Sequence, residues 1–223
     1  SGFENTYSLA FDGSDDYIDC GNDASLQITG NMTVSAWVKK TAIDNQRFIT
    51  RYDGTNKCFY LSILANGKFR FNVTSSNTEV EIDGASSLHD SQWHHVTAVY
   101  TPSTSIKVYV NGILEGTNTS SIGASLDNDS VNFTIGAEGD AELPFTGNID
   151  EVSIFNAIVS VGDLRNGSSG QGNAVPADLT GMSNLQGWWR FEEGSGTSAT
   201  DSSDNSNIGT LTNGPAFSAD VPS

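Results

Sequence analysis

Apolar and polar residues alternate along much of this 223-residue chain, and a period of two indicates β-strands. The alternation is clearest at Tyr7–Phe11, Thr33–Lys39 and Trp93–Tyr100. Successive side chains of a strand point to opposite faces, so each segment offers one face to a core. Further strands are predicted at 57–64, 68–73, 106–110, 131–136, 148–155, 185–191 and 208–211.

Turn residues separate these segments at short intervals. Asn66-Gly67 and Asn111-Gly112 each stand between two alternating runs, which is a strong signal for a β-hairpin. Helical periodicity is almost absent, and one or two helical turns at 159–166 are the best candidate. Many short strands joined by tight turns predict an all-β, two-sheet antiparallel sandwich with little helix.

The composition changes after the last strand of this series. Residues 1–166 are predicted to form the sandwich, and the Gly/Ser-rich residues 167–176 a flexible linker. Residues 177–223 are too few to hold a core alone, yet they carry large aromatic side chains. These side chains, expected to dock on the sandwich or on a neighbouring subunit, are Trp188, Trp189 and Phe191.

The charge balance narrows the possible partners. There are 27 acidic against 10 basic side chains, a formal net charge of -17, which disfavours nucleic acid and anionic membranes. We find no apolar run long enough to span a membrane, so membrane insertion is not expected. The two cysteines, Cys20 and Cys58, can form one disulfide or remain two free thiols.

Five segments in order resemble those of the laminin-G-like and pentraxin-like (concanavalin A-like) jelly rolls. They are residues 8–18, 32–38, 92–100, 106–112 and 145–156. The resemblance covers about residues 7–165 and implies a jelly-roll sandwich.

The C-terminal stretch 187–203 is also similar to this family, although in many members it precedes the jelly roll. Its position here implies a permuted order, or a cut between repeats of a tandem array. Such trailing segments resemble those of marine phage and bacterial surface proteins.

Two acidic loops are the first candidate site. In pentraxins a Glu-x-Asp loop before the closing strand holds calcium with a partner Asp-Asn pair, and the resemblance points to the corresponding loops here. Calcium takes six to eight oxygen ligands, which two acidic loops at one edge could largely supply. The predicted ligands are Asp53, Asn56, Glu138, Asp140 and Glu142, and the alternative is a solvated acidic loop.

A second acidic cluster surrounds the first predicted turn. Asp15 and Asp16 follow a strand, and Asp-Gly-Ser-Asp favours a tight turn without any metal. A structural calcium ion shared with Asp150 is the alternative interpretation of this cluster.

The same acidic segment permits an enzymatic interpretation. Retaining glucanases of this fold carry Glu-x-Asp-x-Glu on a strand, with one Glu as nucleophile and the other as acid/base. Glu138 and Glu142 would take these roles here. Gly139 and the nearby Pro144 depart from that pattern, because proline disfavours a central strand. We therefore expect no enzyme activity.

Aromatic residues near the first site are candidates for sugar stacking, and Tyr52 and Tyr60 are chosen for this role. The alternative is that both are ordinary residues of the sandwich. His94 and His95 are adjacent, so on a strand one would face inward and the other outward. Both are interpreted as structural.

The leading hypothesis is an extracellular or virion-surface binding and adhesion module that binds a glycan or cell-surface polysaccharide with the help of calcium. The alternative is a structural subunit of a phage particle or surface filament. In that case the chain would associate with itself or with other virion or filament subunits through its C-terminal strand. A β-glucanase is the third hypothesis.

Overall fold

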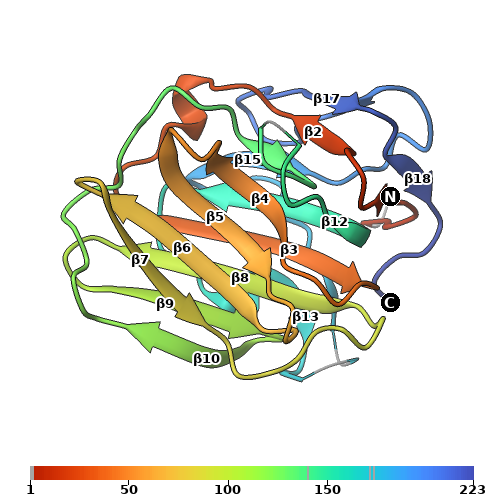
Figure 1. The fold of residues 1–223 in the computed structure, drawn as a ribbon. Helices are drawn as coiled ribbons and strands as arrows, with labels where there is room; N and C mark the ends of the chain where they lie inside the picture. Colours follow the sequence, from red (N-terminus) through yellow and green to blue (C-terminus); the bar gives the residue numbers. More distant parts are fainter. Residues whose placement is uncertain (1–2, 140, 171, 173) are drawn as a thin grey trace.

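The alternating segments form antiparallel strands in a computed structural model that describes residues 3–139, 141–170, 172 and 174–223. The strands make two large sheets packed face to face (Figure 1), which confirms the all-β sandwich. At the turn between Ser105–Val110 and Ile113–Asn118, Asn111 and Gly112 both have positive φ, 51° and 80°, as a two-residue hairpin turn requires.

Sheet A holds the family-like segments. Its strand order is β10 (Ile113–Asn118), β9 (Ser105–Val110), β8 (His94–Thr101), β3 (Met32–Lys40), β12 (Thr146–Phe155), β1 (Ser8–Asp12) and β18 (Ala216–Ser218), and β15 (Leu185–Trp189) pairs with the second half of β12. Strands β1 and β15 therefore share one side of β12, each along half of its length.

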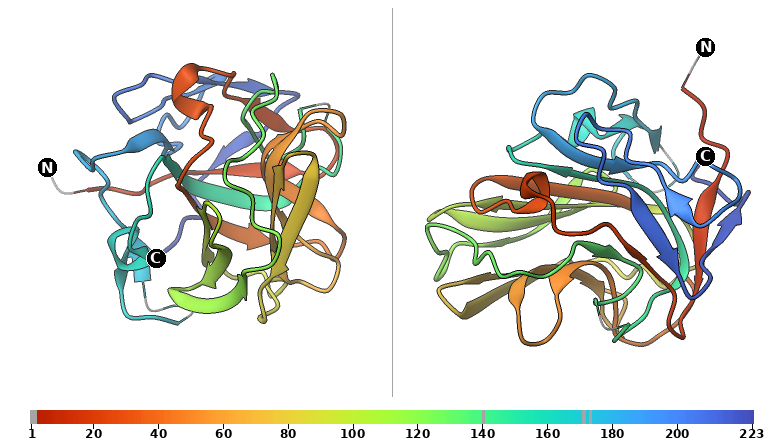
Figure 2. Two further views of the ribbon diagram at one scale, coloured as in Figure 1. Left: turned by 90° about the vertical axis from the view of Figure 1, so that its left-hand side faces the viewer. Right: turned by 90° about the horizontal axis from the view of Figure 1, so that it is seen from above.

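Sheet B carries the candidate site. Its strand order is β16 (Ser198–Ala199), β17 (Gly209–Thr212), β2 (Tyr17–Asp19), β11 (Thr134–Ile135), β4 (Gln46–Tyr52), β5 (Lys57–Ile63), β6 (Phe69–Ser75) and β7 (Thr78–Asp83). Strands β4 to β7 form the front layer of Figure 1, and the view from above in Figure 2 shows them as a layer apart from sheet A.

The main core lies between the two sheets. Its largest fully buried side chains include Phe48, Phe59, Phe69, Phe71 and Trp189. Trp189 comes from the C-terminal segment and stacks on Phe133, with 5.1 Å between ring centroids. The C-terminal segment therefore contributes to the core of its own chain.

The outer face of sheet A is covered in part by residues 156–170 and 174–184. The 3-10 helix η2 (Val161–Asp163) is the helical part of the stretch predicted at 159–166. Leu164, Ala177 and Leu179 pack with Phe155 and Trp188 of sheet A in a small second core. The other 3-10 helix, η1 (Ala24–Leu26), follows β2.

The stretch predicted as a linker has regular structure at both of its ends. Strands β13 (Arg165–Gly167) and β14 (Ala174–Pro176) pair with each other, with Arg165 opposite Pro176. The Gly and Ser residues between them favour a turn as readily as a flexible linker, and here they close a hairpin.

Candidate functional site

The outer face of β4–β7 presents polar side chains in cross-strand rows. One row runs through Arg47, Ser62, Arg70 and Asp83, which are paired residues on neighbouring strands. The next row holds Thr50, Tyr60, Asn72 and Glu81. Paired residues lie on the same face of a sheet, so the side chains of each row are neighbours.

Arg47 is held at the centre of this face by aromatic rings and a carboxylate. Its guanidinium carbon lies 3.8 Å from the ring centroid of Tyr60 and 4.4 Å from that of Tyr52. A guanidinium over an aromatic face is attracted by the ring quadrupole. Arg47 also forms an ion pair with Glu138, whose side chain is only 6% exposed.

The two tyrosines do not present open ring faces. Each is 7% exposed, and the rings meet edge to face with 5.3 Å between centroids. Burial raises the pKa of Tyr60 above its ordinary value, although Arg47 acts in the opposite direction. Their positions therefore favour a role in orienting Arg47 over the predicted role as stacking platforms for a sugar.

Arg70 is the second guanidinium on this face. Its Nε and Nη2 donate to the two carboxylate oxygens of Asp83 at 2.7 and 3.0 Å, and Nη1 donates to Glu81 at 2.8 Å. The hydrogen bonds with Asp83 raise the pKa of Arg70. An arginine has five N–H donors, so this pattern leaves two for a ligand.

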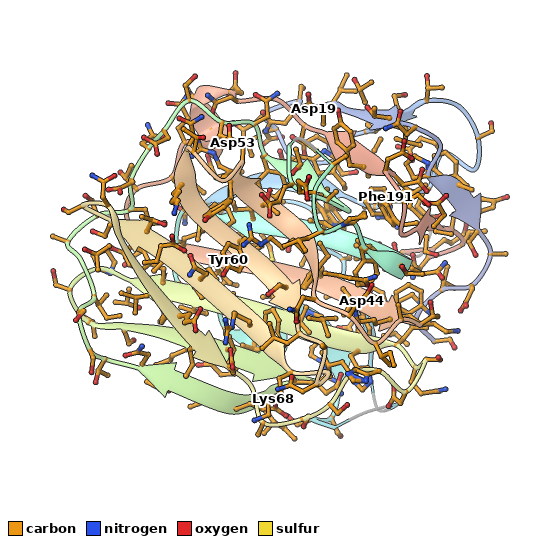
Figure 3. The ribbon with its side chains drawn as sticks, in the orientation of Figure 1. Asp19, Asp44, Asp53, Tyr60, Lys68 and Phe191 are labelled. Atoms are coloured by element: carbon orange, nitrogen blue, oxygen red, sulfur yellow. The ribbon has the colours of Figure 1, made fainter. Side chains whose placement is uncertain are left out.

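A hollow of about 160 Å³ lies between these two arginines. Tyr60 and Ser62 belong to its lining, and Figure 3 shows Tyr60 in the middle of the face. At about 30 Å³ per water molecule, this volume corresponds to roughly five water molecules. The lining residues of this Ser62 hollow are Asn45, Gln46, Arg47, Tyr60, Ser62, Leu64, Arg70 and Leu143.

Several buried polar atoms of side chains on this face lack a hydrogen-bond partner within the described residues. Within the part of the chain that the structure describes, the buried unpartnered atoms include Ser62 Oγ, Asn72 Oδ1 and Thr74 Oγ1. All three side chains belong to β5 and β6, and each residue is at most 3% exposed. A buried polar group without a partner is costly, and a bound water molecule or ligand can supply the missing hydrogen bond.

The first predicted calcium site is not assembled among the described residues. Asp53 accepts hydrogen bonds from the backbone N–H of Thr55 and Asn56, and its other carboxylate oxygen accepts from Asn56 Nδ2 at 2.8 Å. Burial alone would raise the pKa of Asp53, but these hydrogen bonds bring it below the ordinary value. Asp53 and Asn56 thus serve their own turn.

Glu138 lies toward the other end of β4. It pairs with Arg47 near the start of β4, whereas Asp53 follows the end of that strand. Figure 3 shows Asp53 and Asp44 beyond opposite ends of β4. Asp140 lies outside the described residues, and Glu142 is exposed. Among the described residues, the carboxylates of these two loops do not form a group close enough to share a metal ion.

The glucanase interpretation also loses its structural basis. It required Glu138 and Glu142 to alternate along one extended strand. Instead Ala141 N–H donates to Glu138 O and Glu138 N–H to Glu142 O, and Ala141 and Leu143 have positive φ. The segment is a tight turn before β12, because Gly139 and Pro144 do not support a strand here.

The second acidic cluster forms only in part. The carboxylate oxygens of Asp12, Asp15 and Asp16 lie within 4.8 Å of one another. Burial raises the pKa of Asp16, with a further contribution from Asp12 and Asp15. Asp150 is not a member, since Asp12 pairs with Thr146, four residues or about 13 Å along β12.

Asp150 belongs to a different cluster. Its Oδ2 accepts from Asn5 Nδ2 at 3.0 Å, and burial raises its pKa well above the ordinary value. Glu151 follows at a bulge in β12 with φ 48°, and its carboxylate accepts from Trp188 Nε1 at 2.6 Å and from Arg190 Nε at 3.3 Å. These contacts join the C-terminal segment to β12.

The three predicted assembly residues are buried in their own chain. Trp188 is 2% exposed, and Trp189 and Phe191 are fully buried. Trp189 Nε1 donates to Asn207 O at 2.8 Å, so its polar group also has a partner in the same chain. Assembly through these residues would require the segment to leave its own sheet.

His94 and His95 are both buried, although neighbouring residues of β8 point to opposite faces of sheet A. Asn111 Oδ1 accepts from the His95 backbone N–H, which leaves Asn111 Nδ2 to donate to His94 Nδ1 at 2.9 Å. His94 Nε2 lies 2.9 Å from Asp90 Oδ1. Burial lowers the pKa of His95 to about 3, with Arg165 adding to the effect. Arg165 belongs to the β13–β14 hairpin, outside sheet A.

The sequence analysis did not identify Arg47, Ser62 and Arg70. Strand β4 was missed because bulges interrupt its pairing at Arg47/Ile49 and at Arg51/Tyr52, and a bulge breaks the period of two. The available signal was Arg70 in the hairpin strand 68–73, where it alternates with Phe69 and Phe71 and therefore faces outward. Cys20 and Cys58 are buried free thiols.

Comparisons with known proteins give the relatives of this fold. The sequence profile of the concanavalin A-like lectin/glucanases superfamily matches residues 12–165. No curated protein sequence matches the chain. Among the described residues, there is no helix with the length and apolar character that a membrane crossing requires.

Three solved structures illustrate the similarity. A candidate carbohydrate-binding protein from Bacteroides ovatus is 19% identical with a TM-score of 0.71, covering 98% of this chain and 61% of its own. Laminin α1 domains LG4-5 from mouse are 13% identical with a TM-score of 0.55, covering 70% of this chain and 43% of theirs. The sialidase CBM40 from Ruminococcus gnavus, bound to α2,3-sialyllactose, is 17% identical with a TM-score of 0.54. The match covers 69% of this chain and 91% of the CBM40 chain.

Proposed function

The chain belongs to the concanavalin A-like lectin/glucanases superfamily, and from this premise we propose that it is a binding module that takes a carbohydrate into the Ser62 hollow. The observation that carries the proposal is the buried, unpartnered hydroxyl of Ser62 among the residues that line the hollow beside two guanidinium groups. Such a set matches a ligand rich in hydroxyl groups, each of which both donates and accepts. We further propose an extracellular or surface location for this module.

The similar structures support the proposal in a general way. The Bacteroides ovatus protein is described as carbohydrate-binding, and the Ruminococcus gnavus module was solved with a sialyllactose. Their identities are low, and fold alone does not specify a ligand. The proposal therefore depends on the polar rows of β4–β7.

Replacing Arg70 with alanine should weaken glycan binding by roughly 10-fold or more. Arg70 has two N–H groups left after its bonds to Asp83 and Glu81, and a hydrogen bond from a charged donor contributes about 1.5–3 kcal/mol. Binding would be found on a glycan array and measured by calorimetry. The matched control is Lys57→Ala, which removes another paired cation of the same face outside the hollow. Equal losses in both variants would contradict this location.

Calcium assistance is proposed at Asp12, Asp15 and Asp16 instead of the two loops named first. Three carboxylates near one point can supply part of the oxygen set that calcium needs. Calcium at 100 times its Kd should stabilise the fold by about 2.7 kcal/mol, or roughly 5–10 °C in Tm. Thermal unfolding with calcium, and then with excess EDTA, measures this shift. The shift should disappear in Asp15→Asn, and an unchanged Tm in wild type would exclude the site.

A further inference from the structure

Three basic side chains around the Ser62 hollow are paired with carboxylates of the same chain. Arg47 pairs with Glu138, Lys57 with Glu79, and Arg70 with Glu81 and Asp83. Four carboxylates therefore lie beside these three cations. We infer that the hollow selects uncharged saccharides and discriminates against those that carry carboxylate or sulfate groups, an inference that rests on the proposed function.

The pairing of Arg47 is the strongest argument. An acidic sugar that bound this guanidinium would have to replace Glu138, whose side chain is 6% exposed. The displaced carboxylate would remain in a poorly solvated position without its cation, and breaking a buried ion pair in this way is strongly unfavourable. An uncharged hydroxyl group needs no such displacement.

The pairing of Arg70 has the same consequence with a different geometry. Asp83 takes two of its N–H groups in the parallel arrangement that a ligand carboxylate would otherwise use. Glu81 takes a third, so the two remaining N–H groups can donate singly but lie beside two negative charges. Hydroxyl oxygens accept from such donors without repulsion.

The surroundings of the hollow add repulsion at longer range. The chain has a formal net charge of -17. At physiological ionic strength charges separated by more than about 8 Å are largely screened, so the carboxylates of this face dominate. Discrimination should therefore persist at 150 mM salt, whereas a pure effect of net charge would fade.

The test uses a glycan array of matched pairs, in which each neutral glycan is printed beside its sialylated, uronylated or sulfated derivative. For wild-type protein in 150 mM salt, we expect the neutral member to bind at least 10-fold more tightly. Equal or tighter binding of the acidic member would overturn the inference while keeping glycan binding intact. No binding to any pair would overturn the proposed function itself.

Two variants test the cause of the discrimination. Glu138→Gln leaves Arg47 a hydrogen-bond acceptor of the same shape without the charge. This variant should reduce the ratio of the affinities for the neutral and the acidic member of each glycan pair at least 3-fold. Asp204→Asn changes the net charge equally, at an exposed residue of the C-terminal segment. It should leave the ratio of the affinities for neutral and acidic glycans unchanged. Glu81→Gln, at a side chain that is 47% exposed, provides a second variant if Glu138→Gln does not fold. If this affinity ratio were unchanged in both Glu variants, or equally reduced by Asp204→Asn, the carboxylates of this face would not be the cause of the discrimination.

Discussion

Replacing Trp189 with alanine should lower the free energy of unfolding by about 3–5 kcal/mol, the range for a large aromatic residue removed from a core. Trp189 is fully buried between the sheets, and its ring stacks on Phe133. Its indole N–H donates to Asn207 O, so the substitution also leaves a buried carbonyl without its partner. Because domains are stable by only 5–15 kcal/mol, this is a large fraction of the total.

Urea unfolding followed by tryptophan fluorescence and circular dichroism measures this change. The matched control is Trp93→Ala, since Trp93 is partly exposed and lies outside both cores. The Trp93→Ala variant should lose much less free energy of unfolding than Trp189→Ala, because the side chain of Trp93 buries less area. If Trp189→Ala changed self-association and left unfolding unaffected, the aromatic residues would serve assembly rather than the core.

The two interpretations of the C-terminal segment show where local pattern stops being informative. The alternation at 185–191 correctly predicted a strand, confirmed as β15 with its buried tryptophans. Its partner in β12 lies 30 to 37 residues earlier in the chain, and nothing in the local pattern of a strand specifies a distant partner. The choice between the chain's own sheet and a neighbour's therefore needed the structure.

The candidate site shows a second limit. The all-β sandwich and its family resemblance were confirmed, because both depend on segments whose alternation is regular. Asp53 and Glu138 both lie in loops, and their sequence positions do not say which ends of which strands meet. Arg47 lies on a bulged strand, so its outward direction could not be predicted from a period of two.

The histidines illustrate the effect of a second layer. In an isolated sandwich, adjacent residues of β8 would divide between core and solvent. Residues 156–170 and 174–184 cover part of the outer face of sheet A, so His95 is buried although it does not belong to the main core. A covering segment of irregular structure has no periodicity from which its position could be predicted.

Stability should fall as the pH rises from about 4.5 to 7, through the titration of Glu151. Burial raises the pKa of this carboxyl from 4.5 to about 7, against the opposing effects of Arg190 and Trp188. A raised folded-state pKa means that the folded protein binds the proton more tightly than the unfolded chain does. The stabilisation is complete below 4.5 and is lost as the pH passes 7. A shift of this size corresponds to roughly 3 kcal/mol.

The measurement is the free energy of unfolding in urea at several pH values between 4.5 and 8, for wild type and for Glu151→Gln. Glutamine keeps an acceptor for Trp188 Nε1 but cannot ionise, so this variant should lose the Glu151 part of the pH dependence. Trp188→Phe is the control, because it removes the N–H donor and retains the carboxyl. In the wild type, the hydrogen bond from Trp188 lowers the pKa of Glu151. Trp188→Phe should therefore move the loss of stability to higher pH. Parallel curves for wild type and Glu151→Gln would show that other groups control the pH dependence of the fold.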